Sequence, residues 1–309
     1  MCSAFAWISQ NRLYELARQG RRLTPWPGVL VLSACFTFLP SLLPLYEWLA
    51  SYRSISLPVA ALVESVELAV AFGGTIVLVG LWVSFYERRP FSSLGLQRAA
   101  ALAQYGRGLL IGLLAFAGVV GLMALFGAIS FEPSSTAPAG AAAWLGVLLV
   151  LPGWLVQGAS EEIATRGWIL PAISARYHPP LGILLSALFF TAMHAFNPGL
   201  SLMAIANLAL YSLFAALYAL REGSLWGICA FHSAWNWVQG NLFGLSVSGK
   251  VIDTGMLVDL MSSGPEWLTG GTFGPEASLI TTLGFGLAIL FLLLWPAGKV
   301  RGAMNLAGQ

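Results

Sequence analysis

Eight stretches of this chain are apolar over the length of a membrane-spanning helix, and this feature limits its possible folds more than any other. A helix rises about 1.5 Å per residue, so crossing a hydrocarbon core about 30 Å thick takes about 20 mostly apolar residues. The sequence therefore predicts an all-α polytopic bundle of about eight transmembrane helices, in which Pro40 and Pro44 kink the first span and Pro152 the fourth. The candidate spans cover residues 26–48, 66–86, 108–131, 144–172, 179–197, 200–220, 223–246 and 278–297.

The scarcity of charged residues excludes a soluble fold. Asp, Glu, Lys and Arg together make up 9% of the chain and hydrophobic residues 58%, whereas soluble domains average about 25% and about 45–50%. A soluble enzyme, a disordered chain and a secreted disulfide scaffold therefore do not fit. The net charge of +2 leaves no basic stripe of the kind that binds nucleic acid, so the lipid bilayer is the expected partner of most of the surface.

Positive residues are distributed unequally between the two sides of this predicted topology. Of the fifteen Lys and Arg residues, twelve fall on one side, only Arg53 and Lys250 fall on the other, and Arg166 lies inside a span. Positive residues are enriched on the cytoplasmic side of membrane proteins. We therefore expect both termini to be cytoplasmic.

The topology divides the chain into five parts. Residues 1–25 form a cytoplasmic amphipathic segment, and residues 26–131 form the N-terminal transmembrane helices. Residues 140–246 form a transmembrane core with unusual polar residues. Residues 247–277 form a non-cytoplasmic loop or cap, and residues 278–309 form the last transmembrane helix with a short tail. The fourth part is too polar to span a membrane, and loops of this length are uncommon unless they are functional or disordered. If it forms a cap, Leu257 and Trp267 should be shielded from water on the non-cytoplasmic side.

Three of the predicted spans carry polar side chains that are costly inside a membrane. A charge at mid-membrane costs about 2.5–3.5 kcal/mol on insertion scales, so such residues are functional candidates. At about 1.5 Å per residue, the three spans bring these side chains to similar depths of about 14–22 Å. Unrelated polar residues would scatter in depth, so we expect one site. Its members are Glu161, Glu162 and Arg166 in the fourth span, His194 in the fifth, and His232 and Asn236 in the seventh.

The local spacing of these residues indicates which of them can act together. Residues four positions apart share a helix face, and Glu162 and Arg166 have this spacing, as do the two polar residues of the seventh span. Glu161 lies about 100° around the helix from Glu162, so the two carboxylates cannot both face the same partner squarely. We expect Glu161 to face the reaction centre and Glu162 to be held by Arg166, although the sequence also allows the reverse.

This set of residue types suits peptide hydrolysis, but other functions stay open. Hydrolysis needs a base for the water and donors for the developing oxyanion. Two histidines and a carboxylate could instead hold a zinc ion with one open position, although the chain lacks an HExxH sequence and Asn236 suits an oxyanion better. Non-enzymatic alternatives are a membrane scaffold, an immunity factor or a proton-coupled transporter, since buried acids and histidines also form proton relays.

At these residues the chain resembles a known family. Glu161–Arg166 fits an EExxxR motif, Phe190–His194 fits FxxxH and His232–Asn236 fits HxxxN. All three, in this order and each on a predicted span, are the signatures of the type II CAAX prenyl endopeptidases and their bacterial relatives, the CAAX protease and bacteriocin-processing family (CPBP, also called ABI). The resemblance covers roughly residues 140–245, and the later segments look like a bacterial branch.

The resemblance implies an eight-helix intramembrane protease, here of a bacterial inner membrane, that cleaves a membrane-associated peptide or protein. It further implies that Glu161 and His194 polarise a water molecule, that His232 and Asn236 stabilise the oxyanion, and that the second acid and the arginine of the first motif orient the site. No cofactor is then expected, and zinc is the alternative. Neither the substrate nor its prenylation follows from the sequence.

Overall fold

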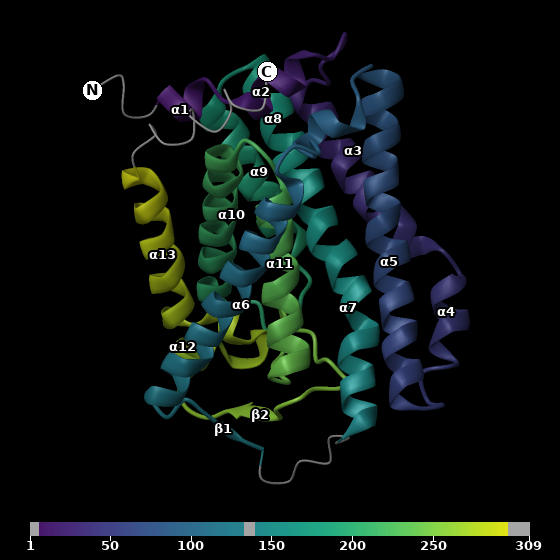
Figure 1. The fold of residues 1–309 in the computed structure, drawn as a ribbon, viewed down its shortest axis with the longest axis vertical. Helices are drawn as coiled ribbons and strands as arrows, with labels where there is room; N and C mark the ends of the chain where they lie inside the picture. The colour runs from purple at the N-terminus through teal and green to yellow at the C-terminus, as the bar shows by residue number, and fades with distance from the viewer. Residues whose placement is uncertain (1–5, 133–139, 296–309) are drawn as a thin grey trace.

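The computed structural model describes residues 6–132 and 140–295 of the chain. Within them, helices run roughly side by side along the long axis of the molecule (Figure 1). The only strands in these ranges are β1 (Ile129–Phe131) and β2 (Leu260–Ser262), which pair antiparallel across one end of the bundle. The fold is therefore mostly helical. The outer ends of the predicted N-terminal segment and C-terminal tail, residues 1–5 and 296–309, lie outside the described residues.

Four helices of the described ranges are long and apolar enough to cross a membrane, and three shorter ones are also apolar. A polytopic helical bundle fits this finding, whereas the count of eight spans stays a prediction. The long helices are α5 (Leu57–Leu81), which a π-helical turn extends to Tyr86, α6 (Ala101–Leu125), α10 (Leu202–Glu222), and the continuous helix made of α7 (Ala141–Glu162), a π-helical segment (Ile163–Ile169) and α8 (Leu170–Arg176). The shorter helices are α3 (Trp26–Phe38) with the 3-10 turn Leu39–Leu42, α9 (Pro179–Met193) and α13 (Leu279–Leu294).

Several of the predicted spans end earlier than the sequence suggested, and two of them carry or approach prolines. The predicted span 26–48 is divided, because α3 stops before Pro40 and a separate helix, α4 (Leu45–Ala50), starts after Pro44. The predicted span 179–197 is also too long, since α9 ends at Met193, ahead of the turn that contains Pro198. Proline lacks the N–H that a continuing helix needs, which explains the break in the first span. The fourth predicted span instead continues through its proline as α7.

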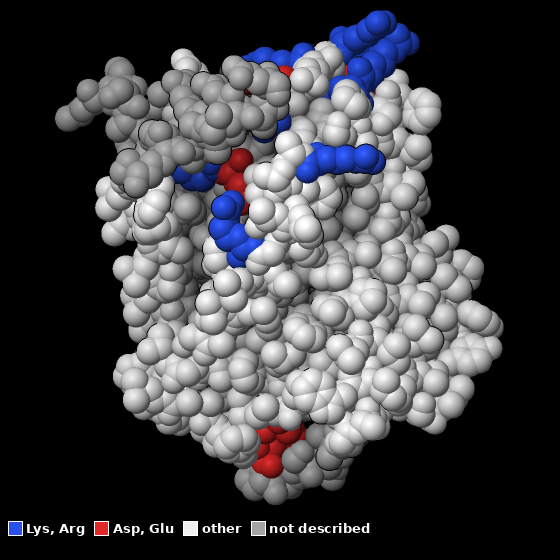
Figure 2. Space-filling view, viewed as in Figure 1, with Lys and Arg blue, Asp and Glu red and all other residues white. Residues whose placement is uncertain are grey.

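One end of the bundle is covered by the N-terminal helices α1 (Ala6–Ser9) and α2 (Arg12–Arg18). On the face shown in Figure 2, Lys and Arg gather at this end. A buried ion pair lies nearby, in which Arg89 Nε donates to Glu87 Oε2 over 2.8 Å. Glu87 Oε1 also accepts from Thr24 Oγ1 at 2.7 Å and from Trp168 Nε1 at 3.1 Å. These contacts join the residue after the α5 extension to the segment before α3 and to the π-helical segment before α8.

A close approach of two helices sets the geometry of the predicted site. Helix α11 (Trp226–Trp237), extended by the π-helical segment Val238–Leu242, packs against α7. A Cβ atom added at Gly158 of α7 would lie 2.5 Å from Ser233 Oγ of α11, which no real contact allows. Small residues at a helix crossing let the backbones come close. Glycine at position 158 therefore brings the acids of α7 within reach of His232.

The segment 247–277 crosses the end of the bundle opposite α2 and contains β2 and the short helix α12 (Glu266–Thr269) (Figure 1). Its first residues line a cavity between the helices. Leu257 is partly buried and its backbone N–H donates to Asn241 O over 3.1 Å. Trp267, however, is 53% exposed, so the described part of the protein does not cover it, and its shielding from water stays a prediction.

Candidate active site

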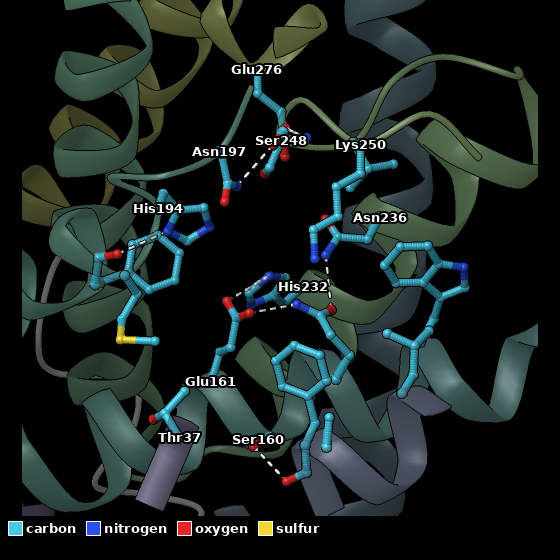
Figure 3. Close-up of a pocket in the computed structure, with 18 of the residues that line it drawn as sticks. Thr37, Ser160, Glu161, His194, Asn197, His232, Asn236, Ser248, Lys250 and Glu276 are labelled. Carbon is cyan, nitrogen blue, oxygen red and sulfur yellow. Dashed lines mark hydrogen bonds and ion pairs between the residues drawn. The ribbon is translucent and has the colours of Figure 1, made fainter. Parts of the chain in front are cut away.

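A cavity of about 690 Å³ lies among the helices that carry the predicted site. Its walls come from α3, α5, α7, α9, α10 and α11, and residues 247–254 close one end. Four predicted residues line it, namely Glu161, His194, His232 and Asn236 (Figure 3). The remaining two, Glu162 and Arg166, are fully buried behind the wall.

Glu162 collects three donors on a single oxygen. Its Oε1 accepts from Arg166 Nη1 at 3.2 Å, from Tyr211 OH at 2.9 Å and from His232 Nδ1 at 2.8 Å. A carboxylate can only accept, so Nδ1 of His232 must carry a hydrogen. The other ring nitrogen, Nε2, is then left for the side of Glu161, whose Oε2 lies 3.7 Å away.

Arg166 is held by aromatic rings as well as by its acid. Its guanidinium carbon lies 4.7 Å from the ring centroid of Phe190 and 5.5 Å from that of Tyr211. Nη1 also donates to Thr165 Oγ1 over 2.8 Å. Cation–π contacts of this kind are stronger where water is excluded. Phe190, which the sequence marks only as part of a motif, thus forms the floor beneath a buried cation.

Glu161 has surroundings opposite to those of its neighbour in the sequence. Its Oε1 accepts from Gln157 Nε2 at 2.7 Å, while its Oε2 is buried without a hydrogen-bond partner among the described residues. Gln157 in turn accepts from Asn236 Nδ2 at 2.9 Å. The rotation of about 100° between consecutive helical residues accounts for the difference: one carboxylate faces the cavity and the other faces the helix contacts behind it.

His194 stands at the C-terminal end of α9 rather than inside a helix. Its Nδ1 donates to Phe190 O over 2.9 Å, so a neutral ring has a free acceptor at Nε2. Figure 3 shows the ring entering the cavity from the side opposite Asn236, with Glu161 and His232 between them. Among the described residues no hydrogen bond joins His194 to Glu161.

Two π-helical segments lie at the motifs: Ile163–Ile169 contains Arg166 of the first motif, and Val238–Leu242 begins two residues after Asn236 of the third. Such turns are rare and occur frequently at functional sites. The second holds Asn241, which accepts from Trp154 Nε1 of α7 at 2.7 Å. These segments therefore help to fix how α7 and α11 face each other.

A tight turn closes one end of the cavity. Val247 and Lys250 exchange both backbone hydrogen bonds at 2.9 Å, and Ser248 between them has a left-handed φ of 47°. Glu276 holds the turn by accepting from Ser248 N at 2.5 Å and from Ser248 Oγ at 2.9 Å, and Asn197 donates to Ser248 O over 2.8 Å. Figure 3 shows the Lys250 side chain extending from this turn into the cavity.

Sequence reasoning missed two residues that touch the acids. Gln157 lies four positions before Glu161, so the same helical spacing that paired Glu162 with Arg166 could have found it. Tyr211 sits on α10 and offers no such signal, because its contact with Glu162 is between distant helices. Within the described ranges, no group of three or more His, Cys, Asp or Glu side chains could hold a metal ion; the zinc alternative stays a matter for experiment.

Comparison with known families agrees with the motifs. Residues 141–238 match the family model described as Type II CAAX prenyl endopeptidase Rce1-like, which confirms the resemblance. The match runs from α7 to the end of α11 and includes every predicted site residue. No curated protein and no solved structure matches the chain. Through residues 141–238, set among helices apolar enough to span a bilayer, the chain is an integral membrane protein similar to the CAAX-type membrane proteases.

Proposed function

We propose that this protein is an intramembrane endopeptidase in which Glu161 activates a water molecule to cleave a peptide bond of a membrane-associated substrate. One observation carries the proposal: Glu161 lines the cavity, and its Oε2, which has no hydrogen-bond partner among the described residues, lies 3.7 Å from His232 Nε2, within ion-pair range. A carboxylate with a free acceptor is what a general base for water requires. The family match supports the same reaction class.

The reaction can be written with the residues that line the cavity. Glu161 Oε2 takes a proton from water, and the water oxygen attacks the carbonyl carbon of the scissile peptide. His194 Nε2 helps to orient this water by accepting its second hydrogen. When the tetrahedral intermediate breaks, Glu161 returns the proton to the leaving amine, as a general base does when it acts next as an acid.

The developing oxyanion needs donors that are already in place. Asn236 Nδ2 has two hydrogens, of which Gln157 uses one. His232 donates through Nε2 when its ring is an imidazolium, because Nδ1 already donates to Glu162. In this state two carboxylates, an imidazolium and the Arg166 guanidinium balance to zero net charge, which is how buried charges are tolerated.

The reverse assignment, with Glu162 as the base, fits the geometry less well. Glu162 does not line the cavity, and its Oε1 already accepts from three donors. We assign it the role of orienting His232. Arg166 compensates the charge of Glu162, so both act by positioning other groups.

We also propose the topology that the sequence predicts, with eight spans, cytoplasmic termini and residues 247–277 on the far side. Support comes from the gathering of Lys and Arg at the end of the bundle that α2 covers. Under this arrangement the turn at Ser248 lies over the non-cytoplasmic end of the cavity. Substrate then enters from the cytoplasm or from the lipid, in a bacterial inner membrane.

The test is a comparison of membranes that contain the wild-type protein or the Glu161→Gln variant. Quantitative proteomics of peptide termini should find a membrane-associated protein that stays uncleaved in the variant, and a farnesylated CAAX peptide is the first defined substrate to assay. Glu15→Gln, on the exposed face of α2, is the matched control and should behave as wild type. Wild-type cleavage by Glu161→Gln would refute the proposal.

A further inference from the structure

Gln157 forms hydrogen bonds with both Glu161, the proposed base, and Asn236, a proposed oxyanion donor. It lies on α7, is 7% exposed, and belongs to none of the three motifs. Its Nε2 donates to Glu161 Oε1 over 2.7 Å, and its Oε1 accepts from Asn236 Nδ2 over 2.9 Å. One amide therefore bridges the base on α7 and a donor on α11.

The polarity of this bridge follows from chemistry. An ionised carboxylate only accepts hydrogen bonds, so the NH₂ end of Gln157 must face Glu161. The carbonyl end then faces Asn236, and only the NH₂ end of Asn236 can meet it. Turning either amide around would set oxygen against oxygen or leave a buried group unpaired, and both are unfavourable.

The same bridge determines which atoms remain for the reaction. Glu161 Oε1 is occupied, so a proton taken from water goes to Oε2, the oxygen without a partner. One hydrogen of Asn236 Nδ2 is occupied by Gln157, so the second is left for the cavity that Asn236 lines. The charge on Glu161 thus sets the direction in which Asn236 donates.

We propose that Gln157 is a positioning residue that orients Asn236 from the ionised Glu161, and that it affects turnover rather than substrate binding. This inference rests on the proposed function. One intramolecular hydrogen bond contributes a factor of about 2–12 to an equilibrium constant, so the loss of two corresponds to about 5–150-fold. We expect a loss of this size in kcat, with KM close to the wild-type value.

Two substitutions of Gln157 distinguish its hydrogen bond with Glu161 from its hydrogen bond with Asn236. Gln157→Met keeps a side chain of similar length and removes both hydrogen bonds. Gln157→Glu keeps an acceptor for Asn236 but places a second carboxylate beside Glu161, where two neighbouring carboxylates resist ionising together. We expect Gln157→Met to lose kcat at every pH. Gln157→Glu should instead recover much of its rate at high pH, with the acidic limb of its pH–rate profile displaced upward.

Ser160→Ala is the matched control. It removes a different hydrogen bond of α7, from Ser160 Oγ to Phe72 O at 2.8 Å, without touching Glu161 or Asn236. It should lower thermal stability slightly and leave kcat unchanged. In the double variant Gln157→Met/Asn236→Ala, the loss should fall well short of the product of the single losses, since both changes remove one arrangement.

The assay uses full-length protein in proteoliposomes with a farnesylated CAAX peptide, and thermal unfolding is measured in parallel. Wild-type kcat in folded Gln157→Met, alongside an inactive Glu161→Gln, would overturn this inference and leave the proposed function standing. A loss explained entirely by a smaller folded fraction would overturn it as well. Turnover by Glu161→Gln would instead overturn the proposed function itself.

Discussion

Two acid–arginine pairs are fully buried among the residues that the structure describes, and they differ in what surrounds them. Glu87 and Arg89 lie near the end of the bundle that α2 covers, and Glu162 and Arg166 lie beside the cavity. The carboxylate of Glu87 accepts from a threonine and a tryptophan, which do not titrate near neutral pH. That of Glu162 accepts from His232, whose ring also faces Glu161.

The comparison shows that a buried ion pair by itself does not indicate an active site. Both pairs bury equal and opposite charges, and each is expected to stabilise its surroundings only while it is complete. The second differs because a histidine connects it to a second carboxylate on a cavity. Breaking either pair should therefore lower stability, whereas only breaking the pair of Glu162 and Arg166 should also lower turnover.

The largest effects are expected from Arg89→Ala and Arg166→Ala. Each leaves a buried carboxylate without its partner, which costs about 3–5 kcal/mol of stability, so both variants should unfold at lower temperature. Turnover per folded molecule should fall only for Arg166→Ala, because Glu162 then no longer holds His232 in place. Thermal unfolding and kcat measured on the same samples check this, and equal turnover in the two variants would break the distinction.

The next largest effect concerns the groups on the cavity. His232→Ala and Asn236→Ala each remove an oxyanion donor, which typically lowers kcat by about 10²–10³-fold. His194→Ala should also lower kcat, because the attacking water then loses a group that orients it. All three should remain folded and inserted in the membrane. Thr75→Ala, also on the cavity but without a role in the reaction, serves as the control. Full kcat in either donor variant would refute its assigned role.

A smaller effect is expected from Glu276, a partly buried acid for which the described residues provide no arginine partner. Burial raises the pKa of Glu276, while the hydrogen bonds from Ser248 act in the opposite direction. An acid with a raised pKa in the folded state stabilises the fold at low pH and loses this contribution as the pH rises through that pKa. Glu276→Gln should therefore flatten the dependence of unfolding temperature on pH between mildly acidic and neutral pH. An unchanged slope would contradict this.

No effect at all is expected from removing metal. The proposed mechanism uses only side chains, so chelation and dialysis should leave turnover unchanged, and purified active protein should hold less than stoichiometric zinc. Elemental analysis and assays before and after chelation test this directly. Activity that disappears on stripping and returns with zinc would establish the zinc hydrolase instead, with the histidines as the first candidates for ligands.

Local relations were predictable from the sequence, whereas relations between helices were not. The spacing of Glu162 and Arg166 indicates a shared helix face, and the two are in contact. The contact of Tyr211 with Glu162 depends on how α10 packs, which periodicity does not describe. The position of His194 within a span was wrong, because hydropathy continues past Met193 while the helix does not. Hydropathy measures how favourably a side chain transfers to lipid, so it does not detect a turn that begins within an apolar run.

The early end of α9 has a consequence for the membrane itself. The helix has 15 residues, so it is about 22 Å long, against a hydrocarbon core of about 30 Å. Leu184 and Leu188 of this helix are more than half exposed, as side chains that contact lipid would be. Acyl chains next to a helix that is too short are compressed or tilted. In the proposed topology α9 crosses the membrane, so we expect the bilayer beside His194 to be thinner than elsewhere, and the length of the surrounding lipid chains to affect how readily water and substrate reach the proposed site.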